Sequence, residues 1–238
     1  MAKLKVVQCW DDAPYNDLRL VEILRKYNAK ATFNINTGLL VEQRRKPFWF
    51  DYKNPDYSVG YFNNFYPGKL TLKDIKEVYD GFEIASHCHM HENASTMPHA
   101  EWIKKAVQAR EILEDIVQRP CRGFAWPCGD YTPETCAELR KAGFAYGRTT
   151  KYIDFVTDNE DAMALRTNCH FMNYQFFQKY EKAKECGVFY FWGHSYEMLD
   201  YDKYWDLLEE KIAYISNDPD AEWCNVIDIA PLCDGKNK

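Results

Sequence analysis

The chain has 238 residues, 46% of them hydrophobic, and a formal net charge of −6 at pH 7. This length and apolar content suffice for one large α/β domain or two small ones with a buried core. The charges are interspersed without a Lys/Arg stripe, and no run of 18 apolar residues is present, so we expect neither a nucleic-acid partner nor a membrane-spanning segment.

The apolar residues recur at spacings that predict strands and helices in alternation. Residues 4–9 form a predicted strand, residues 17–27 have apolar side chains at helical spacing, and residues 30–35 form a second strand. The further predicted strands are residues 82–86, 123–126 and 144–147, a segment near Ala164, and residues 188–192 and 224–229. The further predicted helices are residues 100–117, 133–142 and 201–215.

This alternation predicts an α/β protein with a parallel sheet, because a helix between two strands returns the chain to the same edge of the sheet. About seven such units favour closure into a barrel, and an open doubly wound sheet is the competing architecture. No linker or repeat divides residues 1–238, so we expect a single domain.

One long segment, residues 44–69, has no clear periodicity and is rich in aromatic residues. A loop of this length in a compact domain is usually functional, so we expect a lid or a cleft wall, with a docked extension over one barrel end as the alternative. Its aromatic side chains are Trp49, Tyr52, Tyr57, Tyr61, Phe62, Phe65 and Tyr66.

Two adjacent carboxylates, Asp11 and Asp12, directly follow the first predicted strand. Parallel α/β proteins place their reactive groups at this carboxyl edge of the sheet. Because consecutive residues at a strand end point in different directions, the two carboxylates can take different roles. An aspartate before a helix can also be a simple N-cap, so the pair alone does not establish a site.

Two histidines four residues apart, His87 and His91, follow the strand at residues 82–86. Two neutral imidazoles and one carboxylate form a common open zinc site. Cys88 stands where the zincin motif His-Glu-x-x-His has its glutamate, which argues against a metalloprotease of that class. We expect Cys88 to be a packed thiol and His89 to face away from the site.

A further histidine, His194, ends the strand at residues 188–192 and falls at the same predicted edge of the sheet. A single histidine at this place could be a core residue. Three strand ends that carry Asp-Asp, His-x-x-x-His and His together indicate a catalytic metal site.

With these motifs in order, the chain resembles the polysaccharide deacetylase family, also called the NodB-homology or carbohydrate esterase family 4 group, over nearly its whole length. The matching segments are Cys9-Trp-Asp-Asp-Ala, Lys30-Ala-Thr-Phe-Asn, Phe82-Glu-Ile-Ala-Ser-His-Cys-His-Met-His, Trp126-Pro-Cys-Gly-Asp-Tyr and Trp192-Gly-His. The resemblance implies a distorted (β/α)7-type barrel.

The resemblance also implies a role for each residue of the motifs. Asp11 would be the general base, and Asp12 with His87 and His91 would hold a divalent metal. His194 would be the general acid. Zinc is the expected ion from this ligand set, while cobalt, nickel and manganese remain open.

Two charged positions depart from the family pattern. The arginine that holds the catalytic aspartate in many members is replaced by Ala125, and Arg148 is the candidate replacement, with a structural ion pair as the alternative. The family motif that tunes the general acid has no clear counterpart, and Glu197 or Asp154 could serve instead.

Three further residues concern the substrate side of the site. Cys128 stands where the family has a tyrosine, which leaves its backbone N–H as an oxyanion donor, and Trp126 of the same motif is a candidate substrate contact. His170 could reach the site, although core packing is the favoured reading.

The expected reaction is the removal of an acetyl group from an N-acetylated or O-acetylated sugar or oligosaccharide. The alternatives are hydrolysis of a non-sugar amide or cyclic imide, and a silent carbohydrate-binding protein. No export signal is present, and an odd number of cysteines, nine, suits a reducing compartment, so we expect a cytoplasmic protein, or an extracellular one if a leader has been removed. The oligomeric state stays open.

Overall fold

The computed structural model describes residues 3–50 and 64–235. Its main sheet has nine strands in the order β8-β7-β6-β5-β2-β1-β10-β9, with β11 also paired to β1. Every pair in this sheet is parallel. Its strands are β1 (Leu4–Asp11), β2 (Thr32–Ile35), β5 (Glu83–Ser86), β6 (Gly123–Ala125), β7 (Tyr146–Tyr152), β8 (Leu165–Thr167), β9 (Cys169–His170), β10 (Val188–Gly193) and β11 (Ala221–Trp223).

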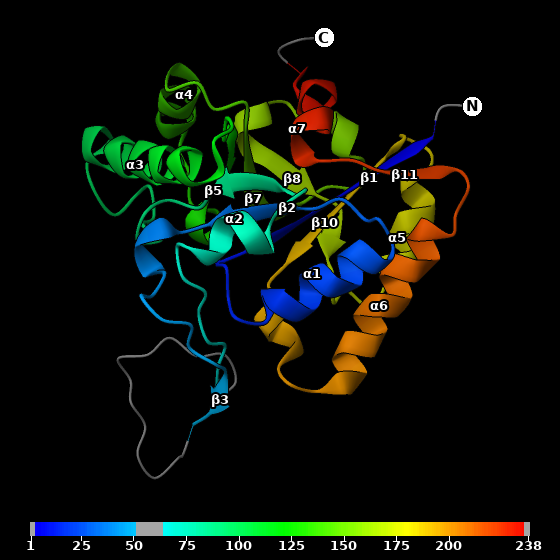
Figure 1. The fold of residues 1–238 in the computed structure, drawn as a ribbon. Coiled ribbons are helices and arrows are strands. Elements are labelled where there is room, and N and C mark those ends of the chain that lie inside the picture. Colours follow the sequence, from blue (N-terminus) through cyan, green and yellow to red (C-terminus); the bar gives the residue numbers. More distant parts are fainter. Residues whose placement is uncertain (1–2, 51–63, 236–238) are drawn as a thin grey trace.

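Helices cover this sheet, and Figure 1 shows α1 with α6 on one flank and α3 with α4 on another. No helix among the described residues is long and apolar enough to cross a membrane. The helices are α1 (Asp17–Lys26), α2 (Asp74–Val78), α3 (His99–Val117), α4 (Pro133–Lys141), α5 (Phe176–Ala183), α6 (Asp202–Ser216) and α7 (Val226–Ile229), with short 3-10 turns η1 (Thr37–Leu39), η2 (Pro127–Gly129), η3 (Val156–Asp158), η4 (Ala162–Ala164), η5 (Ser195–Met198) and η6 (Ala230–Cys233).

The two edge strands of the sheet are joined by a single residue, Asn168, which lies between β8 and β9. Its backbone N–H donates to the Tyr190 carbonyl at 2.8 Å, and its side-chain oxygen accepts from the Tyr190 N–H at 2.8 Å. Its side-chain amide donates to the Asp154 carbonyl at 2.7 Å. The sheet is therefore nearly closed, and the expected distorted barrel is confirmed.

The alternation of side chains along β1 decides which residues face the barrel interior. Val6 and Trp10 pack in the cluster that α1 covers, whereas Val7 and Cys9 belong to a second cluster with residues of β7 and β10. Because side chains two residues apart share a face, Asp11 continues the Val7–Cys9 row. The first strand thus carries a carboxylate to the carboxyl edge of the interior.

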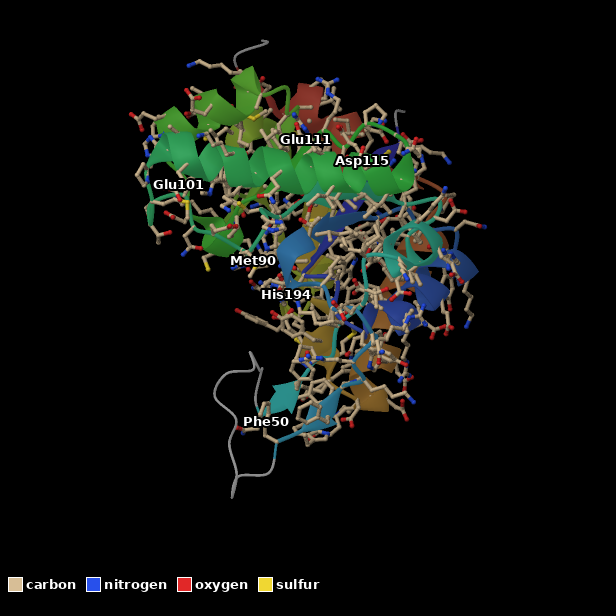
Figure 2. The ribbon with its side chains drawn as sticks, turned by 60° about the vertical axis from the view of Figure 1, so that its left-hand side comes forward. Phe50, Met90, Glu101, Glu111, Asp115 and His194 are labelled. Carbon is tan, nitrogen blue, oxygen red and sulfur yellow. The ribbon has the colours of Figure 1, made fainter. Side chains whose placement is uncertain are left out.

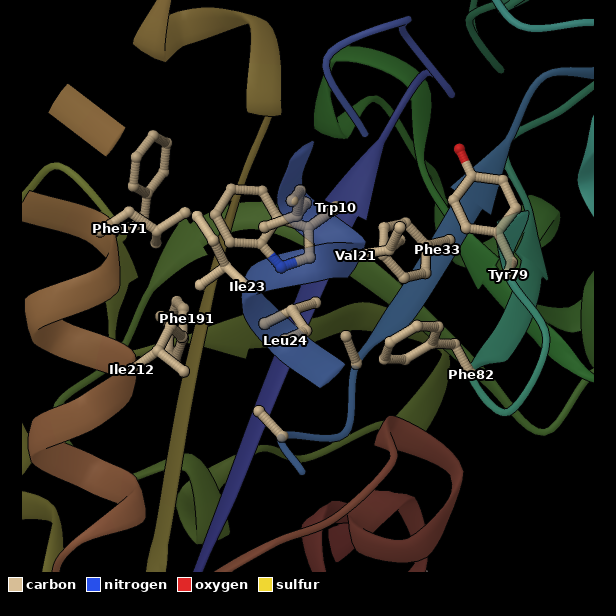
Figure 3. Close-up of a cluster of buried hydrophobic side chains, with 14 of the residues drawn as sticks. Trp10, Val21, Ile23, Leu24, Phe33, Tyr79, Phe82, Phe171, Phe191 and Ile212 are labelled. Atoms are coloured by element: carbon tan, nitrogen blue, oxygen red, sulfur yellow. The ribbon is translucent and has the colours of Figure 1, made fainter. Parts of the chain in front are cut away.

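The cluster that contains Val6 and Trp10 fixes α1 against the sheet. Figure 3 shows Val21, Ile23 and Leu24 of α1 beside Trp10 of β1 and Phe33 of β2. The helix has its buried side chains at helical spacing, which is the pattern that predicted it. Burying each large apolar side chain of this kind stabilises the fold by about 1.5–3 kcal/mol, so the strand ends stand on a rigid base.

The predicted strand at residues 224–229 is wrong. The strand β11 ends at Trp223, and α7 begins at Val226. Asn225 and Asp228 form a capping box, in which each side chain binds the backbone N–H of the other residue, and this arrangement starts a helix. Val226 and Ile229 are both fully buried at a spacing of three, which suits a helix and not a strand.

The aromatic segment at residues 44–69 is described only at its two ends, since residues 51–63, with Tyr52, Tyr57, Tyr61 and Phe62, lie outside the described residues. The ends form an antiparallel pair of strands, β3 (Phe48–Trp49) and β4 (Phe65–Tyr66). The Trp49 indole N–H donates to the Asp200 carboxylate at 2.9 Å, and its ring packs on Tyr201 at 5.5 Å. The hairpin base therefore contacts the segment that leads into α6.

Candidate active site

The side chains that the sequence analysis singled out converge at the carboxyl ends of β1, β5 and β10. Figure 2 views this region, with Met90 and His194 labelled on it and the β3–β4 hairpin beyond, marked by Phe50. The backbone of Asp12 has a φ of 79° and that of His91 a φ of 58°. Such left-handed conformations are costly for residues other than glycine and concentrate at functional sites.

Asp11 is held from two sides. It is 2% exposed, and its Oδ1 accepts hydrogen bonds from the Asn34 side-chain amide at 2.7 Å and from Nη2 of Arg148 at 2.5 Å. Arg148 also donates to the other carboxylate oxygen, and its guanidinium lies 4.7 Å from the centre of the Trp192 ring. The predicted replacement arginine therefore reaches the catalytic candidate.

This contact keeps Asp11 ionised. Burial alone would raise the pKa of the carboxyl, but the Arg148 charge outweighs it, helped by His194, and the pKa of Asp11 is lowered. Burial likewise disfavours the charged guanidinium, yet the Asp11 carboxylate outweighs it and raises the pKa of Arg148. The pair is therefore charged on both sides.

Asp12, His87 and His91 form a group whose potential metal-ligand atoms all lie within 4.8 Å of one another. Nε2 of His87 is 3.8 Å from Oδ1 of Asp12, and the two imidazole rings are 4.8 Å apart and nearly perpendicular. One carboxylate and two imidazoles in this proximity suit a divalent metal with open coordination positions.

The His87 ring is oriented for such a role. Its Nδ1 lies 2.8 Å from the Ala125 carbonyl oxygen, an acceptor, so Nδ1 carries the proton and Nε2 faces Asp12 as a lone pair. Burial lowers the pKa of His87 to about 4, against the opposing charges of Asp11 and Asp12, so the ring is neutral at pH 7. A neutral imidazole is the form that binds metals.

The turn from His87 to His91 rests on η1. The Gly38 N–H donates to the His89 carbonyl at 2.7 Å, and Nδ1 of His89 lies 2.9 Å from the Thr37 hydroxyl. His89 therefore supports the turn and is not part of the Asp12 group, while Cys88 is buried among apolar side chains.

Asp12 has further partners that the motifs did not indicate. The Asn36 side-chain amide donates to its Oδ1 at 2.6 Å, and the Lys69 ammonium donates to its backbone carbonyl at 3.1 Å. The pKa of Asp12 is lowered because the charges of Lys69 and His194 outweigh the effect of burial. Tyr196 also interacts with Asp12 and stacks on His194 at 4.8 Å. Of these residues, only Asn36 had a signal in the sequence, because it directly follows β2, the strand next in the chain after the Asp11–Asp12 pair.

His194 stands next to both carboxylates. Its Nε2 is 3.8 Å from Oδ2 of Asp11 and 3.8 Å from Oδ2 of Asp12, and its Nδ1 is 3.4 Å from Oε2 of Glu197. Burial would lower the pKa of His194, but the Glu197 interaction and the two aspartate charges outweigh it and raise the pKa to about 9. The ring is therefore protonated at neutral pH.

Glu197 is the carboxylate that the structure brings to His194. Its Oε2 accepts from the His194 backbone N–H at 2.9 Å and lies 2.8 Å from Nε2 of His170. Burial opposes its charge, yet the two histidines lower the pKa of Glu197 to about 2. The other candidate, Asp154, instead pairs with Lys182 at 2.9 Å on the surface. His170 is half-buried and borders the site, so the favoured core role does not describe it.

The two residues predicted for the substrate side differ in their surroundings. Cys128 is exposed, with a φ of 53° in the turn that follows β6. Trp126 has no exposed surface, donates its indole N–H to the Met163 carbonyl at 2.8 Å and stacks on Trp102. A ring without exposed surface cannot pack on a sugar, so the predicted substrate contact by Trp126 does not occur in this structure.

Solved structures of similar size share this fold. The Xyl-CE4 domain of a multidomain xylanase from the hindgut metagenome of Trinervitermes trinervoides aligns over 96% of this chain and 90% of its own, with 14% identity and a TM-score of 0.59. The peptidoglycan deacetylase PdaC from Bacillus subtilis aligns over 97% and 91%, with 13% identity and a TM-score of 0.56. A family 4 acetyl xylan esterase from Clostridium thermocellum, solved with a cobalt ion, aligns over 96% and 91%, with 14% identity and a TM-score of 0.55.

A sequence profile described as polysaccharide deacetylase matches residues 1–147, which include Asp11, Asp12, His87 and His91. No curated protein sequence matches the chain. His194 lies beyond the matched segment, and the fold alone brings it to the aspartates. Since the profile covers more than half of the 238 residues and agrees with the shared barrel, the chain belongs to the polysaccharide deacetylase family.

Proposed function

We propose that this protein is a metal-dependent deacetylase that hydrolyses acetyl groups on an acetylated sugar or oligosaccharide. Asp11 is the general base, His194 is the general acid, and Asp12, His87 and His91 hold the metal. Arg148 and Glu197 position and tune the base and the acid. The family supports a deacetylase, and the residue roles rest on the geometry of this chain.

One observation carries the proposal. A carboxylate and an imidazole, those of Asp11 and His194, stand 3.8 Å apart beside a group of three potential metal-ligand side chains. Hydrolysis of an amide needs a base for the attacking water and an acid for the leaving amine, and the opposite pKa shifts of these two groups suit the two tasks.

The three metal-ligand residues fit a divalent cation. The Ala125 carbonyl leaves Nε2 of His87 as the free lone pair, and Asn36 and Lys69 hold Asp12 at one carboxylate oxygen and at its backbone carbonyl. A cation bound there would lower the pKa of a bound water and polarise the acetyl carbonyl. Zinc is the ion that this ligand set favours.

Asp11 and His194 then each carry out one of the two proton transfers. Arg148 and Asn34 fix the Asp11 carboxylate, which takes the proton of the attacking water. His194 gives a proton from Nε2 to the departing amine, and Glu197 keeps the ring charged until that step. The backbone N–H of Cys128 is the proposed donor to the oxyanion.

The substrate class is a soluble N-acetylated sugar or oligosaccharide, with an O-acetyl ester as the second possibility. The structural relatives named as a peptidoglycan deacetylase and an acetyl xylan esterase include both bond types. A panel of N-acetylated and O-acetylated sugars, with simple acetamides as a third group, separates these substrates by the rate of acetate release.

Variants of the two proton-transfer groups test the assignment. Asp11→Asn and His194→Ala should each lower kcat by at least about 100-fold while one metal ion per chain stays bound at Asp12, His87 and His91, because neither side chain belongs to that group. Asp154→Ala, which removes a surface carboxylate, is the matched control and should keep wild-type kcat. If either active-site variant retains wild-type kcat on every substrate that the protein cleaves, the proposed roles fail.

A further inference from the structure

A second group of potential cation ligands lies on the far side of His194 from Asp12. It consists of His170 at the end of β9, His194 and Glu197 in η5, and their ligand atoms all lie within 4.8 Å of one another. Two imidazoles and one carboxylate again form the set. The proposed function uses His194 and Glu197 but leaves His170 without a task.

The His194 ring faces both groups with different nitrogens. Its Nε2 is 3.8 Å from Asp11 and Asp12, whereas its Nδ1 points to the Glu197 carboxylate. This Nδ1 is buried and makes no hydrogen bond of normal geometry to any described residue. One imidazole nitrogen can therefore bind a cation at the second group without turning the ring away from the first.

The distances suit a zinc-sized ion. Tetrahedral zinc holds nitrogen and oxygen ligands about 2.0–2.2 Å away, which places neighbouring ligand atoms about 3.4 Å apart. Nδ1 of His194 already stands 3.4 Å from Oε2 of Glu197. Nε2 of His170 is 2.8 Å from the same oxygen, so this hydrogen bond must open by about 0.6 Å.

Two backbone N–H groups affect how easily the second group can bind a cation. The His194 backbone N–H fixes the Glu197 carboxylate at 2.9 Å, which prepares one ligand. The Met172 N–H donates to Nδ1 of His170 at 3.3 Å, a long contact that the ring must give up to place its lone pair on Nε2. Glu197 also lines a cavity of about 320 Å³ next to Phe171 and Met172.

We propose that His170, Glu197 and His194 bind a second borderline divalent cation such as zinc, and that its binding inhibits the enzyme. With Nδ1 bound, the His194 ring stays neutral, and its remaining Nε2–H is a much weaker acid than the imidazolium. The inhibition rests on the proposed function, whereas the binding site does not. Activity should therefore rise with the first equivalent of zinc and fall with the second.

The test is a zinc titration of the full chain after it has been stripped with a chelator. Calorimetry and elemental analysis should give two zinc ions for the wild type and one for His170→Gln, whose side-chain amide can still donate to Glu197. His99→Gln removes an imidazole at the start of α3 and should keep two. Acetate release should fall several-fold at the second equivalent in the wild type and stay constant in His170→Gln.

The two readouts separate the site from the proposed reaction. A wild type that binds one zinc, or a His170→Gln variant that still binds two, overturns the second site. Two ions in the wild type and one in His170→Gln support the site even if no acetate is released, a result that would count against the proposed function alone. Inhibition by zinc that is equal in both proteins overturns the inhibitory role.

Discussion

At the scale of single residues, the contact between Arg148 and Asp11 decides whether the proposed base is ready to act. Both side chains are buried, so each charge depends on the other. The family pattern has its arginine on the preceding catalytic strand end, and this chain has Ala125 there. Register explains the exchange, because Ala125 and Arg148 are direct partners between β6 and β7. The guanidinium thus comes from the neighbouring strand.

Replacing Arg148 by methionine should lower the free energy of unfolding by about 3–5 kcal/mol, because a buried carboxylate loses its partner. Urea unfolding measures this change. The double variant Arg148→Met with Asp11→Asn should recover much of the loss, since no buried charge remains. Equal stability of the single and the double variant would contradict the charge pairing.

The Glu197 carboxylate supports the charged form of His194, so its removal should change the dependence of kcat on pH. A general acid is active when protonated, and the pKa of about 9 keeps His194 protonated below that pH. In Glu197→Gln the pKa should fall, and the alkaline limb of kcat should move to lower pH by about one unit or more. Asp154→Asn is the control with an unchanged profile. An alkaline limb that does not move in Glu197→Gln would rule out this tuning.

At the scale of elements, the close approach of η1 to the His87–His91 turn holds the second imidazole in place. A Cβ on Gly38 would stand 2.4 Å from Sδ of Met90 and 2.9 Å from the His89 carbonyl oxygen. These contacts are too short, so a side chain at this position must push the turn away from Asp12.

Gly38→Ala should therefore weaken metal binding by about 10–100-fold, as other disturbances of ligand support do. Metal affinity measured with a competing chelator gives the result. Gly81→Ala is the control, because a Cβ there meets nothing within 4 Å, although its φ of 86° adds strain. Metal affinity that falls equally in both variants would show that the contact with the turn is not the cause.

A buried carboxylate joins α1 to the segment after His194. Asp17 accepts hydrogen bonds from the Ser195 hydroxyl at 2.5 Å and from the Tyr79 hydroxyl at 2.6 Å. Burial raises the pKa of Asp17 to about 7, above its value in the unfolded chain. The folded state then binds the Asp17 proton more tightly than the unfolded chain does. The contribution of this proton to the free energy of unfolding is therefore fully present below about pH 4 and is lost as the pH rises to about 7.

Asp17→Asn should remove this part of the pH dependence. The wild type should lose up to about 4 kcal/mol from this group between pH 4 and pH 7, and the variant should not. The difference between their unfolding free energies, measured by urea at several pH values, reports the group. A difference that does not change with pH would contradict the raised pKa.

At the scale of the whole molecule, the sequence predicted the barrel and the strand ends that the structure brings together at the candidate site. Continuous apolar runs predicted β1 and β10, which are buried almost throughout, and helical spacing predicted α1; Asp11 ends β1 and His194 follows β10. The end of the chain was misread, because Asn225 and Asp228 act through a cap that apolar spacing does not record. Apolar spacing therefore failed where hydrogen bonds to the backbone decided between a strand and a helix.

Contacts between residues that are far apart in the chain could not be predicted from the sequence either. Lys69 reaches Asp12 from a segment without periodicity, and Tyr196 and His170 join the site through the closure of the barrel. Trp126 shares a motif with Cys128, yet its ring turns into the core against Trp102. Motifs thus predicted which strand ends meet, whereas side-chain packing decided which residues are exposed at the candidate site.

The central claim is that Asp12, His87 and His91 hold a metal on which hydrolysis depends. The most direct measurement compares bound metal and acetate release in the purified protein, after chelator stripping, after one equivalent of zinc, and in Asp12→Ala. We expect loss of activity on stripping, recovery with the first equivalent of zinc, and, in Asp12→Ala, one zinc ion fewer than in the wild type at saturation and no activity. Acetate release that is unchanged both by stripping and by Asp12→Ala would contradict the account.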